Sequence, residues 1–326
     1  MKTLSALWGV GAAALLLTAC SQGTTTSNVN PGLPAQAGAA HNGVGPNGVT
    51  PRHLASIHGW LSPKHSKSKL LYASNEADNV IDIFSVPQYD LVGQITDGLN
   101  QPEGIATDKN GSLYVSNLSG DTVTIYHKGK TSPSLTLTEP YGPDDVAVAD
   151  NGDVLACDAS GVDVFKPGAT TASSHLTNST ISSVDGVGVD AHNNVYAVGF
   201  NASSQPAVVE FTDLGGSGKN LGLTGLLSPT GVLVDKHGNI AVSDFALPGI
   251  NLYKPGHTAP FATIAASDAT DRSALDHKQN LIYVPEADYS LVNVYKYPSG
   301  KFVQSVSISG SGNFISGTAL SPAPKP

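Results

Sequence analysis

Three acidic residues and one arginine occupy matching positions in the sequence, each directly before a short apolar run of a repeated type. Carboxylates that converge on one point repel one another, so a hard cation, a neighbouring base or protonation must relieve them. An arginine at the same position of the repeat can supply part of that relief without a metal. The sequence therefore predicts a charged ligand or metal site formed by Glu103, Asp144, Asp185 and Arg272.

A second set of polar residues ends the second apolar run of each repeat and is expected on the same face of the fold. There are two alternatives for these side chains. They would supply oxygen ligands or contacts to a polar ligand, or they would accept hydrogen bonds from backbone amides of the loops. No catalytic residue is assigned, because the nearest histidines in sequence, His127 and His175, fall outside both registers. The second set is Asn75, Asn117, Asp158, Asp244 and Glu286.

All these positions belong to one unit that the chain repeats, seen most clearly in residues 100–130. Its three apolar runs are separated by Asn-Gly and Gly-Asp, which predicts short antiparallel strands joined by hairpins. The units recur every 41 to 45 residues, a period typical of propeller blades. The first unit lacks its first strand, and a spare copy stands at residues 317–320. We predict an all-β, six-bladed β-propeller of four-stranded blades, closed by pairing of the C-terminal strand with the first blade.

The N-terminus has the pattern of an export signal, with Lys2 followed by an apolar stretch over residues 4–17. Leu17-Thr18-Ala19-Cys20 resembles the bacterial lipobox, in which the cysteine becomes the acylated first residue of the mature protein. We expect a lipoprotein signal peptide over residues 1–19 and lipidation at Cys20, with the lipid bilayer as a partner. By the same resemblance, Ser21 in place of aspartate favours the outer membrane or cell surface.

The rest of the chain divides by composition. Residues 20–52 carry the acylated cysteine and a tether without large apolar side chains, which is expected to be flexible. Residues 53–69 form a basic linker, and packing on the propeller and a plain solvated linker remain alternatives for it. Residues 70–322 form the propeller and residues 323–326 a tail.

Charge and cysteine content limit the partners. The formal net charge is −9, and all 26 acids follow residue 69, so phosphates would be repelled and nucleic acid is not expected as a partner. Cys157 is the one cysteine left once Cys20 is acylated, so no intramolecular disulfide can form. We expect Cys157 to be a buried core residue and the protein to be monomeric.

The pattern Pro-x-Gly-Val-x-Val-Asp, followed by Asn-Gly-x-Leu-Tyr-Val-Ser-Asn, is seen at residues 102–117 and again at residues 229–244. It resembles the NHL-repeat propellers and the related senescence-marker-protein (SMP-30)/gluconolactonase-like propellers, and the resemblance covers residues 70–322. In gluconolactonase-like enzymes a divalent metal, usually calcium, is held by side chains directly before the inner strands. The resemblance thus implies calcium at Glu103, Asp144 and Asp185, although the asparagine ligands of that family have no counterpart here.

Three functions remain open. The leading hypothesis is a lipid-anchored extracytoplasmic propeller that acts as a binding or interaction module of the cell envelope, for a protein, a glycan or a small molecule. The alternative is a calcium-dependent lactonase or ester hydrolase, in which the metal polarises the substrate carbonyl and binds the attacking water. The third is a purely structural envelope protein. No motif requires a cofactor, and the sequence favours a protein that is not an enzyme.

Overall fold

The computed structural model describes residues 59–326, except residues 140, 288, 309, 311–313 and 325–326. The chain divides into two compact units, residues 1–54 and 55–326, and the described residues belong to the second. The predicted signal peptide, Cys20, the tether and residues 53–58 lie outside the described residues. Within the described part, no helix has the length and apolar character needed to span a membrane.

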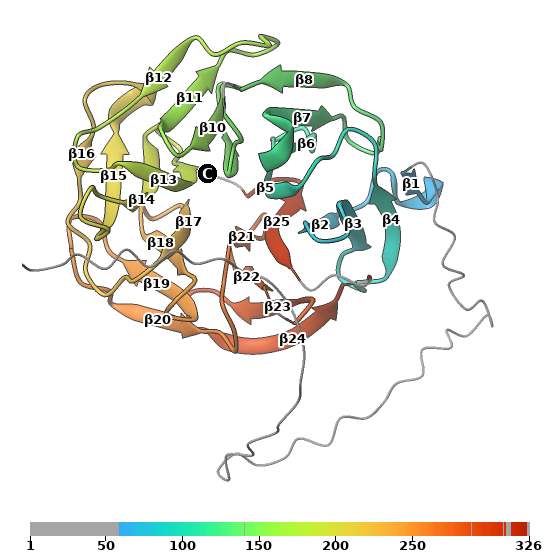
Figure 1. Cartoon of the computed structure of the whole chain (residues 1–326). Helices are drawn as coiled ribbons and strands as arrows, with labels where there is room; N and C mark the ends of the chain where they lie inside the picture. Colours follow the sequence, from blue (N-terminus) through green and yellow to red (C-terminus); the bar gives the residue numbers. More distant parts are fainter. Residues whose placement is uncertain (1–58, 140, 288, 309, 311–313, 325–326) are drawn as a thin grey trace, which may run out of the picture. The chain divides into compact units, whose positions relative to one another are not determined.

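Six antiparallel sheets are arranged around a centre as the blades of a propeller (Figure 1). This confirms the predicted all-β, six-bladed fold. Each blade has an inner strand beside the central channel and further strands that follow outward. We call the face where the inner strands begin the upper face, and the face where they end the lower face.

The first three blades are given from the inner strand outward. Blade 1 contains β25 (Ile315–Ser321), β2 (Leu70–Asn75), β3 (Val80–Ser85), β4 (Leu91–Ile95) and β1 (Trp60–Leu61). Blade 2 contains β5 (Pro102–Thr107), β6 (Leu113–Asn117), β7 (Thr122–Tyr126) and β8 (Leu135–Thr138). Blade 3 contains β9 (Asp145–Val148), β10 (Val154–Asp158), β11 (Gly161–Phe165) and β12 (Ser174–Leu176).

The other three blades follow the same order. Blade 4 contains β13 (Ser183–Val189), β14 (Val195–Phe200), β15 (Pro206–Phe211) and β16 (Lys219–Asn220). Blade 5 contains β17 (Pro229–Val234), β18 (Ile240–Asp244), β19 (Gly249–Tyr253) and β20 (Ala262–Ala265). Blade 6 contains β21 (Ala274–Leu275), β22 (Leu281–Glu286), β23 (Leu291–Lys296) and β24 (Lys301–Ser307). Short 3-10 helices lie at η1 (Pro63–His65), η2 (Leu118–Gly120) and η3 (Thr212–Leu214).

Blade 1 is completed from both ends of the described chain. Strand β25 pairs antiparallel with β2 from Leu70↔Ser321 to Asn75↔Ile315, as the spare repeat copy predicted. A fifth strand, β1, adds to the outer edge of β4 with Trp60 opposite Gln94, so this one blade exceeds the predicted four strands. Closure by β25 pairs the inner edge of β2, which would otherwise offer unpaired backbone groups to another chain.

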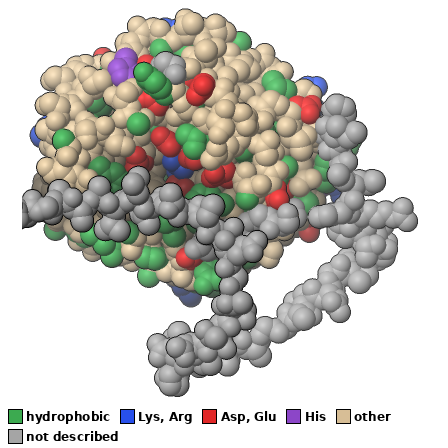
Figure 2. All heavy atoms as spheres, in the orientation of Figure 1, with side chains coloured by type: hydrophobic (Ala, Val, Ile, Leu, Met, Phe, Trp, Pro, Cys, Tyr) green, Lys and Arg blue, Asp and Glu red, His purple; other side chains and the backbone are tan. Residues whose placement is uncertain are grey.

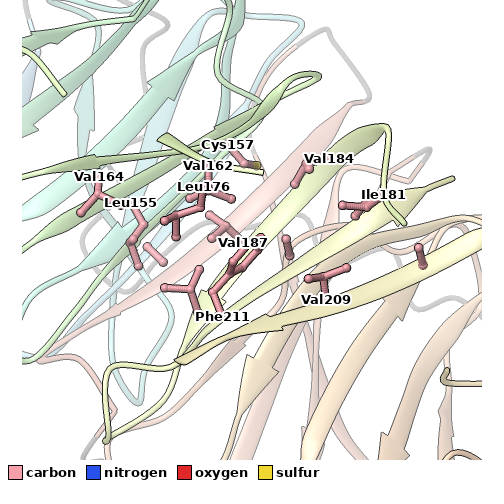
Figure 3. Close-up of a cluster of buried hydrophobic side chains, with 14 residues drawn as sticks. Leu155, Cys157, Val162, Val164, Leu176, Ile181, Val184, Val187, Val209 and Phe211 are labelled. Carbon is pink, nitrogen blue, oxygen red and sulfur yellow. The ribbon is translucent and has the colours of Figure 1, made fainter. Parts of the chain in front are cut away.

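The core lies between blades, because each middle strand is covered on both faces by neighbouring sheets. In β10 every residue is buried, including Cys157, which has no exposed surface and is a free thiol. Figure 3 shows the cluster between blades 3 and 4, where Leu155 and Val164 of one blade face Val187 and Phe211 of the other. Small and β-branched side chains suit this two-sided burial.

The turns at the lower face are fixed by an aspartate that ends the inner strand or follows it. Asp108 Oδ1 accepts hydrogen bonds from the backbone N–H groups of Asn110 (2.9 Å) and Ser112 (2.8 Å). Asp190 and Asp235 accept the corresponding pairs of N–H groups in blades 4 and 5. Such Asx turns hold the hairpins that the Asn-Gly pattern predicted.

Candidate functional site

Arg272 lies at the upper end of the central channel and connects several blades. Its Nη1 donates hydrogen bonds to both carboxylate oxygens of Asp271, each at 3.1 Å. Its Nη2 donates to the backbone carbonyl oxygen of Asp185 at 2.9 Å and lies 3.3 Å from Glu103 Oε2. Its Nε is 3.9 Å from Asp145 Oδ1. We call Arg272, Glu103, Asp145 and Asp271 the Arg272 cluster.

The backbone of Arg272 is held against the closing strand of blade 1. The Arg272 N–H donates to the Ser316 carbonyl oxygen at 3.2 Å, and the Thr318 N–H donates to the Arg272 carbonyl oxygen at 3.0 Å. The guanidinium is thus fixed at its base and projects across the channel. Figure 2 shows basic and acidic side-chain atoms together in a hollow at the centre of the face that it draws.

Gly104 of blade 2 has no side chain, and this allows Asp145 of blade 3 to pack directly against it. A Cβ atom at Gly104 would lie 2.1 Å from Asp145 Oδ1 and 2.6 Å from Asp145 Cα. Real Cβ atoms do not come this close to other heavy atoms, so a larger residue at position 104 would displace Asp145. Asp145 Oδ2 also accepts the Val187 N–H at 3.0 Å, which ties the acid to blade 4.

Burial raises the pKa values of the acids around Arg272, and the arginine limits the rise. The pKa of Glu103 rises to about 8 through burial, against the attraction of Arg272. By the same balance the pKa of Asp145 rises to about 7 and that of Asp271 to about 6. Burial alone would lower the pKa of Arg272, but attraction to Asp271, Glu103 and Asp145 raises it. At pH 7 the cluster therefore holds a permanent cation beside a mostly ionised Asp271, a partly ionised Asp145 and a mostly protonated Glu103.

The four predicted site residues do not all converge. Glu103 and Arg272 form an ion pair, as described above. Asp185 contributes its backbone carbonyl oxygen, while its carboxylate accepts a hydrogen bond from Ser183 Oγ at 3.2 Å. Asp144 lies near enough to raise the pKa of Glu103 by repulsion, and burial raises its own pKa to about 6.

Calcium does not fit this arrangement. In residues 59–326, as far as they are described, no group of three or more His, Cys, Asp or Glu side chains is placed to hold a metal ion. The guanidinium of Arg272 occupies the position between Glu103 and Asp271 where a cation would neutralise the acids.

Two members of the cluster, Asp145 and Asp271, were not predicted as site residues. Asp145 stands where the inner strands of blades 2, 4 and 5 have Gly104, Gly186 and Gly231. This replacement of a glycine by an acid was the available signal. Asp271 directly precedes Arg272, and no repeated pattern marks it.

The second set of polar residues is buried and bonded within the blades. Asp244 accepts the backbone N–H groups of Leu227 and Ser228, which precede β17, and those of Ala246 and Leu247 in the turn between β18 and β19. The remaining members are also 3% exposed or less, and each is hydrogen-bonded to residues of a nearby loop or strand. These bonds match the alternative in which the side chains fix loops, and the members are Asn75, Asn117, Asp158 and Glu286.

Below the Arg272 cluster the channel contains a cavity of about 250 Å³, which we call the channel cavity. Its walls come from the inner strands of all six blades and are mainly Ala, Val, Leu and Gly. Arg272 and Asp145 line its upper end, and the lower-face turns with Asp108 and Lys109 line its lower end. The Arg272 Nε is buried and has no hydrogen-bond partner in the described part of the chain.

A family model for part of this fold matches the chain. Residues 94–125 match the model described as "Strictosidine synthase-like, N-terminal". The match runs from the end of β4 into β7 and contains Glu103. A search of curated proteins found no significant match.

Solved structures share the fold at low sequence identity. A crystal structure of a nidogen/laminin complex contains a chain with a TM-score of 0.67 and 13% identity, covering 79% of this chain and all of that one. Hydrazine synthase of Kuenenia stuttgartiensis has a TM-score of 0.57 and 16% identity, covering 81% of this chain and 89% of its own. A protein of unknown function from Bacteroides caccae has a TM-score of 0.62 and 12% identity, covering 78% and 98%. These likenesses show the propeller fold alone.

Proposed function

We propose that this protein is a lipid-anchored binding module of the bacterial cell envelope and that its central channel takes a small ligand. The observation that carries the proposal is the channel cavity, which has apolar walls between two polar ends. Ligand pockets in proteins typically combine such walls with a few placed polar groups. Arg272, which lines the upper end of the cavity, would donate a hydrogen bond to an acceptor on the ligand, and the apolar remainder of the ligand would contact the walls.

The charge of the site limits the ligand. Arg272 is already paired with acids, so an anion would gain little from its positive charge and would meet Asp145 and Glu103. We therefore expect an uncharged molecule with one hydrogen-bond acceptor or a hydrogen-bonding ring. Entry would be from the lower face, because the Arg272 cluster occupies the upper end of the channel.

Binding is tested by isothermal titration calorimetry of the purified protein with quinoline, an uncharged ring with one hydrogen-bond acceptor, and with naphthalene, its analogue without an acceptor. Ala106 lines the cavity and is half-buried, so Ala106→Phe adds a ring where the ligand would lie. We expect saturable heat in the wild type and at least a tenfold weaker affinity in Ala106→Phe. Equal binding by both proteins would place the probe elsewhere and contradict a ligand site in the channel.

The lipid anchor rests on the lipobox-like Leu17-Thr18-Ala19-Cys20 and would place the propeller outside the cytoplasm, at the outer membrane or cell surface. There the ligand would be a small molecule of the envelope, or one carried by a glycan or protein partner. Cells that express the wild type and are fed an alkyne fatty acid should label this protein, and Cys20→Ala should abolish the label. Label retained in Cys20→Ala would contradict acylation at this residue.

A further inference from the structure

A second group of reactive side chains lies on blade 3, away from the channel. Ser160 is in the upper-face turn between β10 and β11, Asp163 is in β11 and His175 is in β12. Asp163 and His175 are direct cross-strand partners, so both side chains stand on the same face of the sheet. We call Ser160, His175 and Asp163 the Ser160 cluster.

The three side chains form a chain of hydroxyl, imidazole and carboxylate. His175 Nδ1 lies 2.9 Å from Asp163 Oδ1, and His175 Nε2 lies 3.5 Å from Ser160 Oγ. When Nδ1 carries the proton and donates to Asp163, the lone pair of Nε2 points to the serine hydroxyl. This is the order of groups by which a histidine activates a serine nucleophile, and such contacts are often long without substrate.

Two neighbouring residues support this order. A Cβ atom at Gly161 would lie 2.9 Å from His175 Nε2, so the glycine permits the close approach of the imidazole. Glu139 of blade 2 is buried behind Asp163, and burial with a hydrogen bond to Asp163 raises the pKa of Glu139 to about 9. Glu139 is thus neutral at pH 7 and can donate to Asp163, which leaves the Asp163 carboxylate as the partner of His175.

Ser160 Oγ also has a second acceptor. It lies 2.6 Å from Asp158 Oδ1, which accepts the N–H groups of Ser160 and Gly161 as well. Rotation about the Cβ–Oγ bond turns the hydroxyl hydrogen from Asp158 to His175. Asp158 keeps its two backbone donors after that rotation, so the turn that holds Ser160 does not depend on the hydroxyl.

Substrate can reach the hydroxyl. Ser160 is exposed, the His175 side chain is 37% exposed, and Asp163 behind them is buried. A surface pocket open to solvent adjoins the serine, with apolar walls and one acid that disfavours an anionic acyl group. Its lining is Leu118, Tyr141, Gly142, Asp144, Ala159 and Ser160.

We infer that the Ser160 cluster is an esterase site for uncharged esters with a small apolar acyl group, independent of any metal. Ser160 Oγ attacks the ester carbonyl carbon, and its proton passes to His175 Nε2. The bond from the carbonyl carbon to the alcohol oxygen breaks, and that oxygen takes the proton. Water then attacks the acyl-serine, gives a proton to His175, and the proton returns to Ser160 Oγ as the acid leaves. Ester and water become acid and alcohol, and no oxidant or reductant is needed.

The test is hydrolysis of p-nitrophenyl acetate and butyrate by the purified full-length chain in detergent, with labelling by a fluorophosphonate in parallel. We expect turnover above the uncatalysed rate and phosphonylation of Ser160, located by mass spectrometry of the peptide. Ser160→Ala and His175→Gln should each lower the rate at least 100-fold, the scale of a lost nucleophile or general base.

Matched control variants distinguish hydrolysis at Ser160 from nonspecific hydrolysis by other serine and histidine side chains. Ser203 lies in the corresponding turn of blade 4, where its N–H donates to Asn201, and His192 lies 4.0 Å from Asp190 at the lower face. Ser203→Ala and His192→Gln should keep full activity and labelling. Both target changes are at exposed positions, and an unchanged melting temperature will show that they fold. No turnover by the wild type, or turnover that survives Ser160→Ala, would overturn the inference.

Discussion

Replacing Arg272 by methionine should destabilise the propeller at neutral pH and much less at acidic pH. The change removes the cation that contacts Glu103, Asp145 and Asp271 while keeping a long side chain in the channel. Breaking a buried ion pair by removing one partner costs about 3–5 kcal/mol, because the other charge stays buried without compensation. For a domain of this size each kcal/mol corresponds to about 2–4 °C, so the melting temperature should fall by roughly 6–20 °C at pH 7.5.

The pH dependence has a definite sign. Without Arg272 the acids become harder to ionise in the folded state, so the folded protein binds protons more strongly than the unfolded chain does. Stability then falls as pH rises, and at pH 5 the acids of the variant are protonated and need no cation. Thermal melts of both proteins at pH 5 and pH 7.5 therefore give a large difference at pH 7.5 and a small one at pH 5.

Two controls sharpen this experiment. Lys109 is exposed at the lower end of the channel and donates to the Asp150 carbonyl oxygen at 3.1 Å, so Lys109→Met should cost no more than about 1 kcal/mol. Calcium and a chelator should leave the wild-type melting temperature unchanged, because Arg272 already neutralises the acids. An Arg272→Met variant as stable as the wild type at pH 7.5, or equally destabilised at both pH values, would refute the reasoning.

Three further changes test other contacts. Gly104→Ala places a Cβ atom 2.1 Å from Asp145 Oδ1, so we expect a loss of about 1–3 kcal/mol by denaturant titration. Gly215→Ala, where the nearest atom would be 3.8 Å away, should change little. Asp244→Ala leaves four backbone N–H groups without their acceptor and should lower the melting temperature at all pH values; an unchanged value would mean that water replaces the carboxylate. The pKa of Glu139 rises from 4.5 to about 9 on folding, so this residue should make wild-type stability fall between these pH values. Glu139→Gln should reduce the slope and be more stable than the wild type at pH 8, and melts that show the same slope in both proteins would contradict this.

The repeat pattern was sufficient to predict the blades and their closure. Each unit carries its own strand and turn signals, so the period of the sequence transfers directly to the fold. The pattern leaves one blade without an inner strand, at the position beside β2. The spare copy at residues 317–320 was predicted to fill that position, and the structure confirms the pairing. The fifth strand of blade 1 was not predicted, because β1 contains two residues and depends on the free edge of β4.

The register also placed Glu103 and Arg272 on the same ring at the end of the channel, but it could not show which atoms meet. An arginine side chain is long enough to cross the channel, so Arg272 of blade 6 reaches the Asp185 carbonyl oxygen of blade 4. The repeat pattern shows which positions are equivalent, but it does not show how far a side chain extends across the channel. The Ser160 cluster was missed for a related reason, since His175 meets Ser160 only through the pairing of β11 with β12.

The two proposed sites lie in different parts of the propeller, one in the central channel and one on blade 3, and they depend on different residues. Arg272 draws together groups from blades 2, 3, 4 and 6, and this fixes the upper end of the channel while the lower end stays open to the channel cavity. A site in that cavity therefore needs an intact cluster, and Arg272→Met should weaken quinoline binding. The Ser160 cluster is bonded within blade 3 and supported by blade 2, so ester hydrolysis should persist in Ala106→Phe. Loss of both properties in Ala106→Phe would mean that one site, and not two, accounts for them.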